Sequence, residues 1–265
     1  MWEAFLPIIG FLIGLVSVMV GLGGGFLVVP LLTLVYAFAP ANAVGTSLTT
    51  ILMTTAVASA YFAKLKQTYY KMGLILAVTS IPGALVGSYL TAEVSGQVIG
   101  LLIGVFLVFV AWQMVYRKGT ANSCEKSEVD SGFSEKELFS KKKSVLFGLV
   151  LCFFAGLCGG LLSIPGVLLV PIMVLVLRMP FKTVAATSVF MMVFISLAGV
   201  AQHVSLGNIN LEYALLIGSG SMFGGLVGVH LCKITKSQTL RWVLAGLLLF
   251  ISLQMFLKFG LGFNY

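Results

Sequence analysis

Residues 21–30 have the sequence GLGGGFLVVP, and residues 162–171, found 141 positions further along the chain, have the sequence LSIPGVLLVP. From Gly25 and Gly166 onward the two copies align without a gap as far as Met114 and Met255. The same step carries Thr46-Ser47 onto Thr187-Ser188. Two copies of one unit in a very apolar chain are typical of a transporter built from two related halves, with its binding site where the halves meet.

The composition is that of a protein embedded in a membrane. Hydrophobic residues make up 59% of the 265 residues, charged residues make up 9%, and the mean hydropathy is +1.10. A soluble domain carries about 25% charged residues, so a soluble fold of this length could not cover its surface. We predict an all-α, multi-pass protein of the cell membrane, surrounded by lipid. No basic face with interleaved aromatic residues is present, so nucleic acid is not an expected partner.

The charged residues are concentrated in one stretch. Half of the 24 charged side chains lie between positions 117 and 143, where Ser is frequent and aliphatic residues are few. This composition is typical of a solvated linker. We therefore divide the chain into a first transmembrane repeat (1–116), a charged cytoplasmic linker (117–143) and a second transmembrane repeat (144–265).

Each half contains five apolar runs. They lie at about 4–20, 26–38, 43–63, 72–92 and 97–116, and again at about 145–162, 164–178, 183–204, 211–232 and 239–259. A full helical span takes roughly 20 residues, a length that the last three runs of each half reach. The first two runs of each half are shorter and are separated by Gly or Pro. They are compatible with two tilted crossings or with a broken, re-entrant hairpin.

Loop charges predict the orientation, because Lys and Arg are enriched in cytoplasmic loops. Lys64, Lys66 and Lys71 place the loop after the third run in the cytoplasm. The equivalent loop of the second half, residues 203–212, has no Lys or Arg and is expected outside. Equivalent loops then face opposite sides, which requires an odd number of crossings per half and makes the repeats inverted. Both termini are expected outside.

The glycine cluster is the first candidate for a functional site. Gly23, Gly24, Gly25 and Pro30 are expected to break a helix at membrane depth, because glycine accepts positive φ and proline lacks a donor. The freed backbone groups are tolerated there only if they line a cavity or are buried in protein. A dinucleotide-binding interpretation of the glycines is rejected, since no strand–turn–helix surrounds them.

The second copy has diverged at this site. Only Gly166 and Pro171 remain in register, and Ile164-Pro165 replaces Gly23-Gly24. Four other glycine pairs have the spacing of close helix packing. These pairs are Gly10/Gly14, Gly83/Gly87, Gly100/Gly104 and Gly224/Gly228.

Paired hydroxyl residues form the second candidate. Thr46, Ser47, Thr187 and Ser188 each follow a helix-start signal by a few residues. Hydroxyls there add donors to a helix end that already favours an anion. The alternative is a hydrogen bond back to the carbonyl four residues earlier in the same helix. Their matching placement in both copies favours binding.

Acidic residues are absent from the apolar runs. Outside the linker only Glu3, Glu93 and Glu212 occur, all at run edges. Buried carboxylates are the usual ligands of proton and metal-cation pathways, so the sequence disfavours a metal-ion carrier and favours an anion. No cofactor or metal site is expected, and an enzyme is disfavoured because no nucleophile–base pair is visible. Arg178 and Lys182 are interpreted chiefly as topology markers.

The cysteines and histidines carry little signal. No cysteine pair has the CxxC spacing, and Cys158 is interpreted as a small packing residue. His203 and His230 stand at the positions of Phe62 and Tyr89 in the first copy. We interpret both histidines as polar residues at the membrane interface rather than as proton relays.

The chain resembles the TauE/SafE family of sulfite and organosulfonate exporters. The residues that carry the resemblance are Gly21-Leu22-Gly23-Gly24-Gly25 with Pro30, Ala43-Val44-Gly45-Thr46-Ser47, Gly166 with Pro171, and Ala185-Ala186-Thr187-Ser188. The resemblance implies transport of small sulfur-containing anions such as sulfite or sulfoacetate. The chain departs from the family pattern at the second glycine triplet, where it has Ile164-Pro165-Gly166.

The leading hypothesis is a secondary transporter that exports such an anion by alternating access. The substrate would bind between the two breaks, near the Gly and Pro residues and the four hydroxyls named above. The alternatives are an anion channel and a transporter of another small carboxylate or oxyanion. The coupling ion, for which a proton is one candidate, and the oligomeric state are not visible in the sequence.

Overall fold

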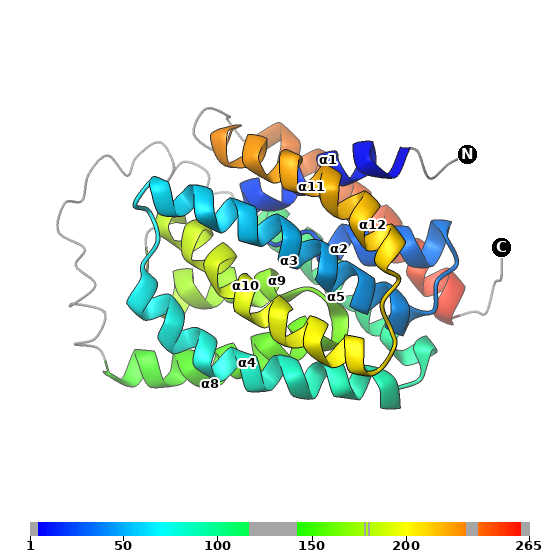
Figure 1. Cartoon of the computed structure of the whole chain (residues 1–265), viewed down its shortest axis with the longest axis horizontal. Coiled ribbons are helices and arrows are strands. Elements are labelled where there is room, and N and C mark those ends of the chain that lie inside the picture. Colours follow the sequence, from blue (N-terminus) through cyan, green and yellow to red (C-terminus); the bar gives the residue numbers. More distant parts are fainter. Residues whose placement is uncertain (1–4, 117–141, 178, 180, 232–237, 261–265) are drawn as a thin grey trace.

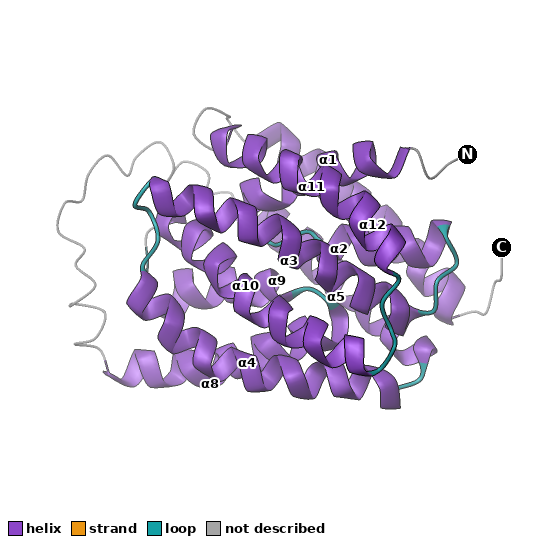
Figure 2. Ribbon diagram, viewed as in Figure 1, coloured by secondary structure: helices purple, strands orange, loops and turns teal. Residues whose placement is uncertain are grey.

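Every regular element in the described part of the chain is a helix (Figures 1 and 2). The structure, a computed structural model, describes residues 5–116, 142–177, 179, 181–231 and 238–260. The predicted linker, 117–143, lies outside these residues except for its last two positions, which already belong to a helix. The all-α prediction is confirmed.

The two halves contain the same series of helices. The first half has α1 (Leu6–Val20), α2 (Gly25–Pro30), the π-helix η2 (Leu31–Val35), α3 (Pro40–Lys64), α4 (Tyr70–Glu93) and α5 (Gly96–Tyr116). The second half has α8 (Lys142–Leu162), α9 (Pro165–Pro171), the π-helix η3 (Ile172–Val176), α10 (Phe181–Ser205), α11 (Leu211–Leu231) and α12 (Gln238–Gly260). Adding 141 to the bounds of η2 and α3 gives those of η3 and α10.

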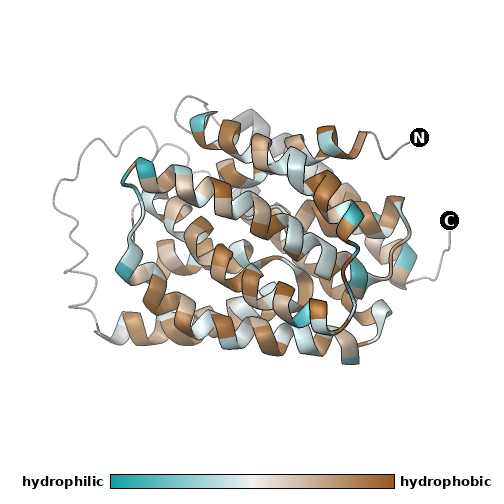
Figure 3. Ribbon diagram, in the orientation of Figure 1, coloured by the Kyte–Doolittle hydropathy of each residue, from teal (hydrophilic) through white to brown (hydrophobic). Residues whose placement is uncertain are grey.

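The outer surface is apolar. Figure 3 shows hydrophobic residues along the lengths of the helices and hydrophilic ones mainly near their ends. Large side chains such as Phe223 and Leu146, each 66% exposed, point outward. Five helices of the described part, α3, α4, α8, α10 and α11, are long and apolar enough to cross a membrane. A surface of this kind is stable in lipid, and the chain is a multi-pass membrane protein.

The second segment of each half is short. Helix α2 and η2 together span residues 25–35, which at 1.5 Å per residue is about 16 Å, roughly half of the hydrocarbon thickness. Pro30, which has no N–H to donate, is the last residue of α2, and the chain continues directly into the π-helix η2. The following π-turn is tied down by Lys258 of α12, whose Nζ donates to the Thr33 carbonyl at 2.7 Å. These lengths favour the broken hairpin over two full crossings.

Glycines bring the long helices into close contact. Helix α1 packs on α11, and its counterpart α8 packs on α4, the counterpart of α11 (Figure 1). A Cβ at Gly224 would overlap the carbonyl of Phe11, and one at Gly83 would overlap the carbonyl of Phe153. The packing interpretation is confirmed for the pairs Gly10/Gly14, Gly83/Gly87 and Gly224/Gly228, which all meet backbone. In the fourth pair, Gly100 meets the ring of Phe259 instead.

This packing predicts the effect of single methyl groups. Gly224→Ala and Gly83→Ala should each lower the free energy of unfolding by about 1–3 kcal/mol, because backbone cannot move aside as a flexible side chain does. Unfolding in mixed detergent micelles measures the change. The matched control is Gly246→Ala in α12, where a Cβ would meet nothing within 4 Å. Equal stabilities of all three variants would contradict the packing argument.

Candidate functional site

The first helix break lies between α1 and α2. Gly21, Gly23 and Gly24 have φ values of +76°, +82° and +87°, in the left-handed region that favours glycine. The N–H of Gly21 donates to the Val18 carbonyl and that of Leu22 to the Ser17 carbonyl, which ends α1. The glycine triplet therefore supplies both the turn and the first residue of α2, as the sequence predicts for a broken helix.

The second break uses a different residue. Between α8 and α9 a single residue, Ser163, has positive φ, at +61°. Pro165 then starts α9, where its fixed φ suits a first helical turn. Sequence analysis missed Ser163, because an isolated serine carries no signature of left-handed backbone. The available signal was Pro165, two residues later, because proline favours the first turn of a new helix and so indicates a break just before it.

The two breaks touch each other. A Cβ at Gly25 would overlap the carbonyl oxygen of Ser163, and a Cβ at Gly166 would overlap the backbone of Leu22. Leu22 and Ser163 are equivalent positions in the repeat, as are Gly25 and Gly166. The contact is thus reciprocal. It gives a physical reason why this one glycine of the triplet is present in both copies.

The serines of the two hydroxyl pairs reach across the repeat to these breaks. The Ser163 hydroxyl donates to the Ser47 hydroxyl of α3 at 2.9 Å. The Ser188 hydroxyl of α10 lies 3.3 Å from the carbonyl of Gly21 and 3.0 Å from that of Ala185. Each serine therefore contacts the break of the other half, and all of these residues are buried.

The threonines beside them have different partners. The Thr46 hydroxyl accepts a hydrogen bond from the N–H of Asn210 at 3.0 Å, and the Thr187 hydroxyl accepts one from the N–H of Tyr69 at 3.1 Å. Asn210 and Tyr69 immediately precede α11 and α4. The structure thus brings Ser47 and Ser188 to the breaks and engages the threonines at helix starts. Pro30 and Pro171 lie at the far ends of α2 and α9.

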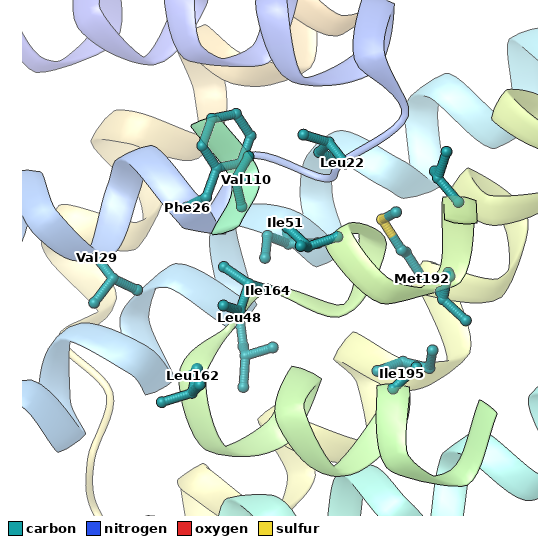
Figure 4. Packing of buried hydrophobic residues seen from close by; sticks show 14 of the residues in the cluster. Leu22, Phe26, Val29, Leu48, Ile51, Val110, Leu162, Ile164, Met192 and Ile195 are labelled. Carbon is teal, nitrogen blue, oxygen red and sulfur yellow. The ribbon is translucent and has the colours of Figure 1, made fainter. Parts of the chain in front are cut away.

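Apolar side chains surround the contact between the breaks. Figure 4 shows Leu22, Ile51, Ile164 and Met192 among the buried residues of this region. The Met192 thioether lies beside both Gly23 and Gly166, and Ile51 lies beside Gly25. Among the described residues no three His, Cys, Asp or Glu side chains gather as metal ligands. The polar groups at the site are therefore backbone groups and serine hydroxyls.

The two histidines differ in exposure. His230 is exposed, but His203, two residues before the end of α10, is completely buried, so its ring packs against protein and does not face the membrane interface. Its ring lies beside Gly45 of α3, where a Cβ would come 3.1 Å from the imidazole. Cys158 is half-buried. Arg178 and the Lys182 side chain lie outside the described part of the chain.

Comparison with known proteins identifies the family. The family described as sulfite exporter TauE/SafE matches residues 6–255, and the chain belongs to it. The chain is 30% identical over 265 residues to the probable membrane transporter protein YunE of Bacillus subtilis, covering 94% of this chain and 96% of that protein. It is 24% identical over 269 residues to a probable membrane transporter protein of Methanocaldococcus jannaschii, covering 95% and 94% respectively. No solved structure matches the chain.

The reciprocal contact predicts a steric effect at the centre of the molecule. Gly25→Ala and Gly166→Ala should each destabilise the folded protein by about 1–3 kcal/mol, because the added methyl group meets backbone of the opposite break. Gly104→Ala in α5 is the control, since its Cβ would make only ordinary contacts of 3.5 Å or more. Thermal unfolding in detergent measures the difference. If Gly25→Ala were as stable as Gly104→Ala, the breaks would not be in contact.

Proposed function

We propose that this TauE/SafE family member is a secondary transporter that exports a small sulfur-containing anion, such as sulfite or sulfoacetate, by alternating access. The family description supports the sulfur-containing substrate. The proposed location of the binding site rests on one observation, the reciprocal contact of the two breaks at Gly25 and Gly166. Discontinuous helices that meet between two repeats are a recurrent design of transporter binding sites.

An anion at this position would be held by hydrogen-bond donors without a fixed positive charge. The hydroxyls of Ser47, Ser163 and Ser188 lie at the breaks, each now bonded to a protein acceptor or to another hydroxyl. On binding, an oxyanion would replace these acceptors. The N–H groups of a first helical turn have no partner within their helix, and a buried site strengthens each interaction with charge. The described carboxylates, Glu93 and Glu212, are exposed and do not oppose an anion.

Alternating access rests on an inverted arrangement of the halves. The Ser252 hydroxyl of α12 donates to the Gly104 carbonyl of α5 at 2.9 Å, and Phe259 lies against Gly100. Residue numbers rise along α5 as they fall along α12, so these two equivalent helices run antiparallel. Equivalent helices in opposite directions support two halves that cross the membrane with opposite topology. One half rocking against the other would then expose the breaks to each side in turn.

Transport assays with purified protein in vesicles test the substrate. Labelled sulfite or sulfoacetate should enter the vesicles faster than labelled acetate. Ser47→Ala and Ser163→Ala should lower the initial rate by about 10- to 100-fold, because a hydrogen bond to a charged group contributes about 1.5–3 kcal/mol. Thr49→Ala is the control, since its hydroxyl bonds the Gly45 carbonyl of its own helix at 3.1 Å. If neither sulfur anion moves, the substrate proposal is wrong, and large electrical currents would indicate a channel.

Reporter fusions test the orientation. Alkaline phosphatase fused after Tyr265 should be active, because the C-terminus is predicted outside. A fluorescent protein inserted in the predicted linker, 117–143, should be fluorescent, because that segment is predicted to be cytoplasmic. A fusion that places Tyr265 in the cytoplasm would contradict the topology and, with it, the odd number of crossings per half.

A further inference from the structure

His203 of α10 has an environment that packing does not explain. None of its surface is exposed, and neither ring nitrogen has a hydrogen-bond partner in the structure. The nearest polar group is the backbone of Gly160 in α8, whose contact with the ring is too poorly aligned to be a good hydrogen bond. An unpaired buried polar group costs about 1–3 kcal/mol, so such a group in a native protein requires an explanation.

In the first half of the chain, an apolar residue occupies the position equivalent to His203. The counterpart of His203 is Phe62, which is buried in an apolar cluster with Val18 and Ala186. Ala186 is in turn the counterpart of Gly45, which lies beside His203. The fold therefore accommodates a phenylalanine at this position. Stability alone would favour Phe at 203 as well, because Phe leaves no polar atom unpaired.

The position of His203 links it to the candidate anion site. Gly45 precedes Ser47 by two residues in α3, and Gly160 precedes Ser163 by three residues at the end of α8. Ser47 and Ser163 are the pair that joins α3 to the second break. The imidazole thus contacts the same two helices, at backbone positions two and three residues before the serines. A movement that parts the second break from α3 would also uncover the imidazole.

The helices packed against α10 offer no buried counter-ion to a protonated imidazole. Their described titratable residues are Tyr61 and Lys64 on α3, Tyr70, Lys71, Tyr89 and Glu93 on α4, and Cys152 and Cys158 on α8. Lys64, Lys71 and Glu93 are exposed. A buried charge without a partner is strongly unfavourable. A proton on His203 is therefore unfavourable while the imidazole is enclosed in protein, and it becomes favourable when water or an anion reaches the ring.

We propose that His203 is a proton-binding site, and that one proton travels with each anion in the same direction. The proposal rests on the anion transport proposed above. When the site faces water, His203 takes a proton from that side, and the anion bound at the breaks serves as its counter-ion. On the opposite side the anion leaves, the imidazolium loses its counter-ion, and the proton is released to water. The protein then returns to face the first side without a proton on His203 and without a bound anion.

Proton and anion movement can be measured together in vesicles that contain the purified full-length protein. Labelled sulfoacetate is the anion, and a pH-sensitive dye reports the pH of the lumen. In the wild type, external anion should acidify the lumen, and acid outside should raise the initial rate of uptake about 10-fold. His203→Gln should abolish the acidification. When the pH is the same on both sides of the membrane, the rate of anion exchange by this variant should not change with that pH.

Two further variants separate a proton site from a structural role. His203→Phe introduces the residue that the first half already has at the equivalent position. This variant should lose proton coupling as His203→Gln does, and it should elute from a size-exclusion column like the wild type. His230→Gln removes the exposed histidine of α11 and should keep full proton coupling. Wild-type acidification by His203→Gln, or its loss in His230→Gln alone, would overturn the proposal.

A titration without substrate distinguishes failure of this proposal from failure of the proposed function. In wild-type protein labelled with 15N-histidine, one set of ring signals that His203→Gln lacks should change from the neutral to the protonated form as the pH is lowered over the range in which the protein stays folded, because water reaches the ring when the site opens. If the wild type transports no tested anion, the proposed function is wrong and this titration still tests the proton site. If the His203 signals stay in one protonation state over the whole range, the proton site is wrong even when anions are transported.

Discussion

The backbone at the two helix breaks must be kept away from lipid, and much of the molecule is arranged around that constraint. Hydrocarbon offers no hydrogen bonds, so the peptide groups released at Gly21–Gly24 and at Ser163 are tolerated only inside protein. The molecule meets the constraint by placing each break against the other. The overlap of any Cβ at Gly25 with the Ser163 carbonyl, and at Gly166 with Leu22, shows how close this contact is. The serines of α3 and α10 then bond the breaks from opposite halves.

The glycine contacts between the long helices hold the two breaks in place. Helix α1 leads into the first break and packs on α11, while α8 leads into the second break and packs on α4. Each hairpin is thereby attached to a helix of the other half. In lipid, helices gain little from burying apolar surface, and close backbone approach through small residues is a main source of association. A hairpin whose second arm is too short to cross the membrane depends on this attachment for its position.

The sequence predicted the helices well because the repeat supplied two observations of each element. It also located the first break, since three adjacent glycines exceed the needs of packing. It did not separate Thr46 from Ser47, because neighbouring helical residues point about 100° apart and tertiary contacts decide which one faces the break. It missed Ser163, whose positive φ is imposed by the surrounding structure. It did not predict the burial of His203, because the end of an apolar run gives no sign of whether a polar residue faces lipid headgroups or the protein interior.

The two halves share a scaffold but differ at its centre, and this difference bears on the proposed transport cycle. In a perfectly two-fold protein the outward-facing and inward-facing states would be related by the two-fold axis and would have equal free energy. Here one break is formed by three left-handed glycines and the other by a single left-handed serine, which also bonds Ser47. Only the second break lies beside a buried imidazole, because the position related to His203 is filled by Phe62. If the protein works by the proposed alternating access, opening it on one side would expose different groups from opening it on the other. We then expect the two states to differ in free energy and in how they respond to pH and to an anion.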